Sequence, residues 1–239
     1  MRKLKSLTIS AASSLFAAGL AVGAFAPHPA HAVVIVLGGG LGQACYEAAY
    51  AVSRGLTPDP FVMTGTNVEM RPVQICTAAL DSSSELNARD AAGTYVNRGV
   101  LLFADGDYRG SLRDFDSAIS ADDDIGESHA NRGAALVAMH RWADSIPSID
   151  KGLALMASEP EKSYYNRAIA NEELGNVRGA YFDYLKAAEL RPEWQPPRDQ
   201  LTRFTVRTRT AAGTVATQPG TANLPPASPA NRPPVPSAK

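Results

Sequence analysis

The tripeptide Asn97-Arg98-Gly99 returns as Asn131-Arg132-Gly133 and again as Asn166-Arg167-Ala168, at spacings of 34 and 35 residues. Other positions keep the same register, with small residues at Ser111, Ser145 and Ala180 and large residues at Phe115, Ile149 and Tyr184. Agreement of several positions at one period of this length indicates an internal structural repeat. We therefore predict three consecutive helical hairpins over residues 92–193.

Each repeated slot suits a pair of helices joined by a tight turn. A small residue such as Gly99 lets the first helix of a pair approach the second closely. Gly106 and Gly175 suit the left-handed residue that ends a first helix, and Pro192 falls where a helix must stop. Pro147 lies inside an expected helix and should kink it or shift its start. We expect helices at about 92–104, 108–121, 127–139, 142–157, 161–174 and 177–190.

The period and these residues resemble the tetratricopeptide repeat family over about 100 of the 239 residues. The resemblance implies an all-α fold in which antiparallel helical hairpins stack into a solenoid, also called an α-α superhelix. Three hairpins meet the usual minimum for a continuous core. We interpret the chain as an exported bacterial protein of this tetratricopeptide type.

The first 32 residues have the three parts of a secretory signal peptide. A basic start precedes an uncharged stretch rich in Ala, Leu and Gly, and small residues stand at Ala30 and Ala32. We predict cleavage after Ala32 and export to a bacterial periplasm. Cleavage after Ala26 is a second choice, and retention of the segment as a membrane anchor is the alternative.

The charge balance bears on the partners. Removing the predicted leader takes three of the 23 Lys and Arg and leaves 20 basic against 24 acidic residues. A mildly acidic chain is a poor binder of polyanions, so nucleic acid is not an expected partner. No later segment is long and apolar enough to span a membrane, so we expect no membrane span after cleavage.

The two cysteines, Cys45 and Cys76, both precede the repeats. In an exported chain a pair without metal-ligand spacing indicates a disulfide. The alternative is a free thiol or a thiolate nucleophile, which needs a partnering base. Leu41–Ser53 and Val68–Leu80 are predicted helices. Residues 33–91 are therefore expected to form a degenerate hairpin, tied by the disulfide, that caps the repeats.

Two segments follow the repeats. Residues 194–209 are expected to include a short capping helix, at Pro197–Val206, that buries Leu201, Phe204 and Val206. Residues 210–239 are dominated by Ala, Pro, Thr, Ser and Gly. Such a composition cannot bury enough apolar surface to order itself, so we predict a disordered tail.

Acids stand sixteen residues after two of the repeat arginines, in the pairs Arg98–Asp114 and Arg167–Asp183. This spacing places each acid on the facing second helix, so we predict structural ion pairs within the hairpins. In the second repeat Ser148 takes the place of the acid, and Arg132 is expected to use Asp150 instead. The alternative is that the three arginines reach a bound anionic ligand.

The repeated asparagines indicate where a partner binds. In the family such an Asn can face the concave groove and hydrogen-bond the backbone of an extended peptide; the alternative is a bond to neighbouring backbone. The carboxylate-clamp subtype requires Lys and Asn where Val96 and Val100 stand, so we do not expect this chain to bind a carboxylate in the manner of that subtype. The resemblance implies a partner-binding groove lined by Val96, Asn97, Val100, Phe103, Ala130, Asn131, Ala134, Lys162, Tyr165, Asn166, Ile169 and Glu172.

The sequence contains no Ser/His/Asp or Cys/His set and no recognisable pair of carboxylates, so we expect no catalytic, cofactor-binding or metal site. The Gly-rich run after Val36 lacks the offsets of a dinucleotide-binding loop. Asp122-Asp123-Asp124 lacks the spaced ligands of a calcium site. We predict an adaptor or assembly scaffold, not an enzyme, that binds a peptide or a partner helix. The alternatives are a structural envelope component that uses its convex face or tail, and an enzyme with a site in residues 33–91.

Overall fold

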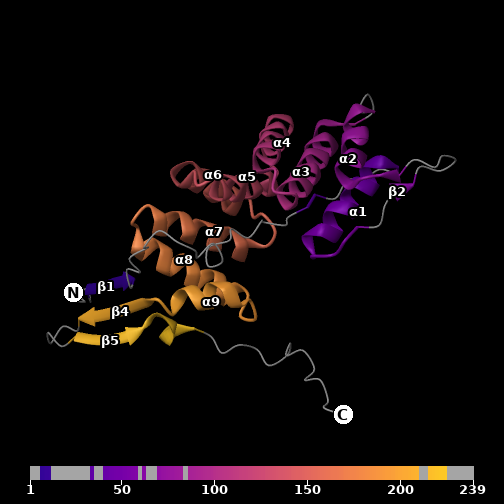
Figure 1. Ribbon diagram of the computed structural model, residues 1–239. Coiled ribbons are helices and arrows are strands. Elements are labelled where there is room, and N and C mark those ends of the chain that lie inside the picture. The colour runs from indigo at the N-terminus through magenta and orange to yellow at the C-terminus, as the bar shows by residue number, and fades with distance from the viewer. Residues whose placement is uncertain are drawn as a thin grey trace, which may run out of the picture.

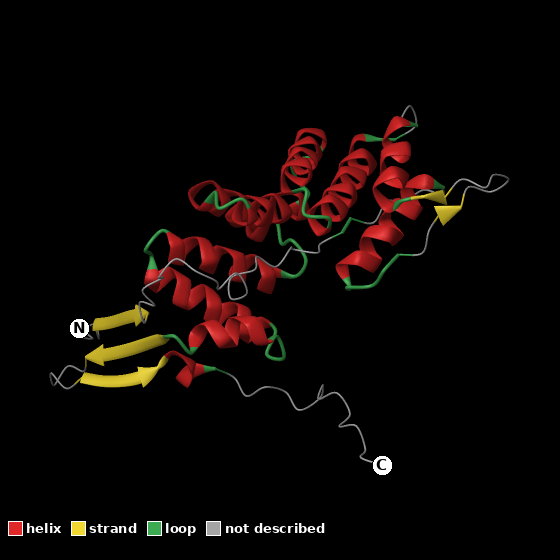
Figure 2. Cartoon of the chain, in the orientation of Figure 1, coloured by secondary structure: helices red, strands yellow, loops and turns green. Residues whose placement is uncertain are grey.

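The structure, a computed structural model, describes residues 6–11, 33–34, 40–58, 61–62, 69–82, 86–209 and 215–224. Helices predominate over these residues, as the repeat predicts (Figures 1 and 2). Six helices pair into three antiparallel hairpins, and each hairpin packs against the next. The hairpins are α3 (Ala88–Ala104) with α4 (Tyr108–Ala121), α5 (Gly126–Ala138) with α6 (Trp142–Ala154), and α7 (Pro160–Glu173) with α8 (Val177–Leu190).

The hairpin turns follow from a few residues. Gly106 and Gly175 adopt φ angles of 81° and 78°, in the left-handed region where a side chain would be strained. His140 takes the same region in the second hairpin, with φ 58°. Asp107 and Asn176 follow the two glycines, and each caps a second helix by accepting a hydrogen bond from the amide three residues on. These local signals fix where each hairpin reverses.

Close approach within the hairpins depends on the small residues of the repeat. A Cβ atom added at Gly99 would lie 2.5 Å from the ring of Phe115, and one at Gly133 would overlap the side chain of Ile149. Phe115 and Ile149 are buried and fill the space that the glycines leave. The small and large slots of the repeat are therefore the two sides of one contact.

The region before the hairpins, where we predicted a cap, contains two helices joined by a disulfide. Helices α1 (Leu41–Ser53) and α2 (Pro72–Asp81) pack against each other and against α3. The Cys45–Cys76 disulfide joins them, and both cysteines are fully buried. The predicted disulfide is thus confirmed. Helix α2 begins at Pro72, later than predicted, because Glu69–Met70 forms a short strand, β3, that pairs with β2 (Phe61–Val62).

A three-stranded antiparallel sheet lies at the other end of the stack. Its order is β1 (Ser6–Ala11), β4 (Phe204–Arg209) and β5 (Val215–Pro219), with β4 in the centre. Helix α9 (Gln195–Leu201) precedes it and packs on α8. The predicted capping helix therefore ends at Leu201, and its extension to Val206 is wrong. Phe204 and Val206 are buried as expected, but by alternation along a strand.

Strand β5 and the short 3₁₀ helix η2 (Gly220–Asn223) lie in the segment predicted to be disordered, so that prediction is wrong for residues 215–224. All five residues of β5 are exposed, so backbone pairing with β4 holds the strand, and composition gives no sign of this pairing. The hydroxyl of Tyr181 donates to the carbonyl of Gly220 at 3.3 Å and fixes the end of the segment. The rest of the predicted tail lies outside the described residues.

Strand β1 lies within the predicted leader. It pairs with β4 from Ser6 opposite Arg209 to Ala11 opposite Phe204, and Leu7, Ile9 and Ala11 pack against the core around α8 and β4. Residues 12–32, with the predicted cleavage site, lie outside the described residues, so cleavage stays a prediction. Among the described residues, no helix has the length and apolar character to cross a bilayer.

Candidate functional site

The first helices of the three hairpins form one side of the stack, because α5 contacts both α3 and α7. The predicted groove lies on this side. The short segment Val33–Val34, which precedes the cap in sequence, lies against α3 and α5 here (Figure 1). The candidate site therefore already holds a piece of extended chain.

The side chain of Asn97 holds the backbone of Val34. The side-chain Nδ2 of Asn97 donates to the backbone carbonyl oxygen of Val34 at 2.8 Å, and the backbone N–H of Val34 donates to Oδ1 of Asn97 at 2.9 Å. Asn97 is 0% exposed, so its amide has no bulk water to bond instead. The bonded residue is 63 positions away in the sequence, so Asn97 bonds the backbone of a distant segment of the same chain and not that of its own helix.

The two valine side chains reach different parts of the site. Val33 packs against the cluster that contains Val100, Phe103 and Ala134, whereas Val34 packs against the cluster that contains Val96. Successive side chains that point to opposite sides are the property of an extended chain. The site thus provides two apolar slots on either side of one backbone clamp.

The residues predicted to line the groove are covered in this structure. Eleven of the twelve are buried: Val96, Asn97, Val100, Phe103, Ala130, Asn131, Ala134, Lys162, Tyr165, Asn166 and Ile169. Part of the cover comes from Val33–Val34 and part from packing between the hairpins. Val33 and Val34 pack against the clusters that contain Val96, Val100, Phe103 and Ala134, whereas Tyr165 and Ile169 belong to the core of the third hairpin.

The charged members of the predicted groove are bonded within the chain. Lys162 lies 2.9 Å from the carboxylate of Glu159, and burial lowers the pKa of its ammonium group despite this partner. Glu172, the one half-buried member, accepts hydrogen bonds from Arg203 at 2.8 Å and from the Tyr184 hydroxyl at 3.2 Å. We therefore place the candidate site on the Asn97 side of the stack, away from these two side chains.

At the third hairpin, aromatic side chains pack around Tyr165 on the first helix α7. The ring of Tyr165 meets that of Tyr184 at 5.5 Å between centroids and that of Trp194 at 5.1 Å. Burial raises the pKa of both tyrosine hydroxyls. Tyr165 is among the predicted partner contacts, but here it is a core residue that joins α7 to the start of α9.

The predicted ion pairs are present at the first and third hairpins. Arg98 grips Asp114 with two hydrogen bonds of 2.8 and 2.7 Å, and Arg167 grips Asp183 with bonds of 2.9 and 2.7 Å. Hydrogen bonding to Asp114 raises the pKa of Arg98. Bidentate contacts of this kind satisfy a guanidinium group in a fixed plane.

The second arginine departs from the prediction. Arg132 bonds Asp116 at 2.7 Å and the hydroxyl of Ser148 at 2.6 Å, whereas Asp150 pairs with Arg167. The partner acids thus come from the preceding hairpin, and the pairs link one repeat to the next. All three repeat arginines hold carboxylates, so the geometry does not support the alternative of an anionic ligand shared among them.

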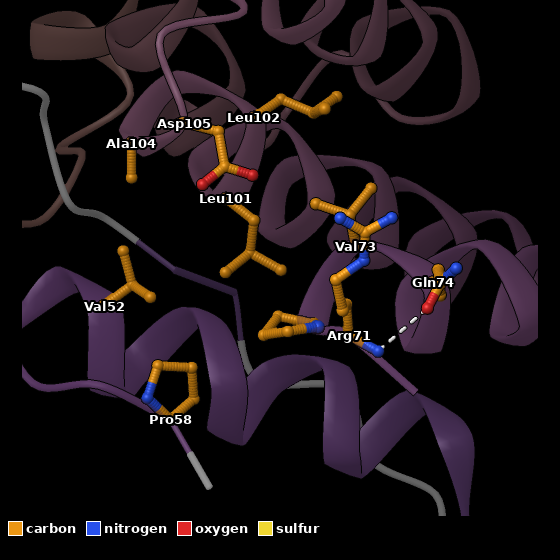
Figure 3. A pocket seen from close by; sticks show the side chains of 10 residues that line it. Val52, Pro58, Arg71, Val73, Gln74, Leu101, Leu102, Ala104 and Asp105 are labelled. Atoms are coloured by element: carbon orange, nitrogen blue, oxygen red, sulfur yellow. Dashed lines mark hydrogen bonds between the residues drawn. The ribbon is translucent and has the colours of Figure 1, made fainter. Parts of the chain in front are cut away.

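A separate pocket of about 450 Å³ lies between the cap and α3 (Figure 3). Its described lining is mainly apolar: Val52, Pro58, Pro72, Val73, Leu101, Leu102 and Ala104, with Arg71, Gln74 and Asp105 as polar members. Asp105 is the one carboxylate among the described lining residues, which include no Ser, Cys, His or Lys.

No protein-family model matches the sequence, and no curated protein matches it. The tetratricopeptide resemblance consequently stays a prediction from the repeat. The candidate site rests on its own geometry, chiefly the contacts between Asn97 and Val34.

Proposed function

We propose that this chain is a protein–protein interaction module, an adaptor or assembly scaffold, whose tetratricopeptide-like hairpins hold an extended peptide along their first helices. The observation that carries the proposal is the double hydrogen bond between the Asn97 side chain and the backbone of Val34. It is the kind of contact that a groove makes with a peptide main chain, whatever the side chains of that peptide are.

The energetics of Asn97 support a role in binding. A buried amide that loses its partner costs about 1–3 kcal/mol for each unsatisfied group. An Asn that only shaped the hairpin would bond its own helix, but Asn97 instead presents both its donor and its acceptor to another segment. Such a residue favours the state in which some extended chain occupies the slot.

The setting of the site supports the rest of the proposal. Hairpins that stack at a 34- to 35-residue period, with first helices in contact, are what the tetratricopeptide resemblance implies. A buried disulfide between α1 and α2 is typical of proteins that fold in an oxidising compartment, which supports export to a periplasm.

The test compares the groove with the opposite face. Peptides selected from a displayed library on the full chain are measured for affinity against the wild type, Asn97→Ala and Phe182→Ser. Phe182 is a suitable control because its side chain is exposed on the second helix α8. We expect Asn97→Ala to weaken binding and Phe182→Ser to leave it unchanged. The reverse result would favour the alternative of a component that binds through its convex face.

A further inference from the structure

The chain's own residues show what the groove accepts. Val33 and Val34 are adjacent, half-buried and β-branched; Val33 packs against the clusters around the disulfide and around Phe103, and Val34 packs against a third cluster. The cluster against Val34 contains Ala92, Val96, Ala118 and Ile125, with Tyr95 and Ala121 packed against it. Val34 meets this mainly aliphatic cluster with a compact β-branched side chain of restricted rotamer freedom.

The same contacts show that the site is occupied from within. Asn97 bonds a residue that belongs to the same chain but lies outside the repeats, at a separation of 63 residues. A tethered segment competes at an effective concentration that is set by the length and stiffness of its connection. An external peptide must therefore compete with it, and its apparent affinity falls by the fraction of chains whose slot is open.

From these two observations, and resting on the proposed function, we propose that the partner is an extended segment with two adjacent β-branched apolar residues that binds by displacing Val33–Val34. Its second β-branched residue takes the position of Val34, with its N–H and C=O on the Asn97 amide. Its first takes the position of Val33 beside Val100 and Phe103. Val33–Val34 thereby indicates which side chains the partner needs and how tightly the partner must bind to displace it.

The experiment uses a labelled peptide, Gly-Ser-Ala-Val-Val-Ser-Gly, and fluorescence polarisation on the full chain. The variant V33D/V34D weakens the internal occupant, because two carboxylates resist burial, while the groove is left intact. A third protein, V33D/V34D/N97A, removes the backbone clamp as well. Control peptides carry Ser-Ser in place of Val-Val, or an N-methyl group on the second valine to block its hydrogen bond. Circular dichroism verifies that every variant is folded.

We expect V33D/V34D to bind the Val-Val peptide at least ten-fold more tightly than the wild type, and N97A to abolish this gain. Both control peptides should bind weakly. Equal affinity of the wild type and V33D/V34D would overturn displacement while leaving the groove as a binding site. Insensitivity of peptide binding to N97A would overturn the proposed function itself, so the two failures give different results. Equal binding of the Ser-Ser peptide would overturn the assigned partner chemistry.

Discussion

Two extended segments from before the cap, Val33–Val34 and β1, are held by the rest of the molecule in different ways. At Val33–Val34 the side-chain amide of Asn97 bonds the backbone of Val34, and three apolar clusters receive the valine side chains. At β1 six consecutive residues pair with six residues of β4. The first mode specifies two adjacent residues; the second specifies a strand length and an alternation.

The difference between the two segments indicates which of them another peptide can replace. The described contacts at the clamp are the two bonds of Asn97 to the Val34 backbone and the apolar packing of the two valines, which a foreign segment can reproduce. The pairing of β1 places Leu7, Ile9 and Ala11 against the core around α8 and β4, so a substitute must match a whole register. Hydrogen exchange at the Val34 amide and at the β4 amides reports on the two regions separately, so the pair of readouts distinguishes local opening of one from opening of both.

The largest expected effect is at the sheet. Phe204 is 1% exposed and its ring meets those of Tyr181 and Tyr184, so Phe204→Ala should cost about 3–5 kcal/mol of unfolding free energy. We expect faster exchange in β4 under native conditions and unchanged protection at Val34. Chemical denaturation measures the loss of unfolding free energy, and hydrogen exchange measures the protection. Loss of protection at Val34 to the same extent would show that the two regions open as one unit.

The next largest effect is at the cap. Closing a loop with a sequence separation of 31 residues stabilises a fold by roughly 3–4 kcal/mol in the chain-entropy model, so Cys45→Ala/Cys76→Ala should lose about that amount. Val33 also packs against the cluster around the disulfide. The Val34 amide should therefore lose more protection than β4. Thermal unfolding with and without reductant is the check, and the double variant should be insensitive to reductant.

A smaller and more local effect is expected at the clamp. Asn97→Ala removes both bonds to Val34 and should cost about 1–3 kcal/mol. Exchange at Val34 should accelerate while β4 stays as it is. Asn97→Asp is the matched variant, because a carboxylate accepts from the Val34 N–H but cannot donate to its carbonyl. If Asp restored full protection of Val34, the donated bond would have no importance.

The smallest expected effect concerns the set of repeat arginines and their carboxylates. The Arg132–Asp116 pair is partly open to solvent, so Asp116→Asn should change the unfolding free energy by only about 0.2–1 kcal/mol. Neither Val34 nor β4 should change its exchange rate. A double-mutant cycle with Arg132→Gln measures the coupling. A coupling above about 2 kcal/mol would mean that this ion pair is central to the stack.

Much of the helical part can be predicted from the sequence, because the repeat period places equivalent residues at equivalent positions of each hairpin. The sequence alone assigns Gly99 to the close approach within a hairpin and pairs Arg98 with Asp114, but that Phe115 faces Gly99 is learned from the structure. It does not identify the partner of Arg132. In the other two pairs the acid follows the arginine within one hairpin, whereas Asp116 precedes Arg132 by sixteen residues and belongs to the preceding hairpin.

The sheet and the clamp were harder to predict for physical reasons. In β4 the buried and exposed residues alternate over only six positions after a helix, too few to distinguish a strand from a capping turn. Strand β5 buries none of its side chains and is visible only as backbone pairing. The repeat identified the slot of Asn97, but nothing in the sequence near Val33–Val34 names this segment as its occupant.

The pairing of β1 with β4 joins a segment that is synthesised early to one that is synthesised late. Residues 6–11 leave the ribosome about 200 residues before residues 204–209, an interval of about 10–40 s at 5–20 residues per second. Throughout that interval the segment has no strand to pair with and is open to any export machinery that recognises apolar leaders. A role as leader and a role as strand therefore compete through the order of synthesis. The strand can form only in chains whose translation is nearly complete while residues 6–11 are still attached.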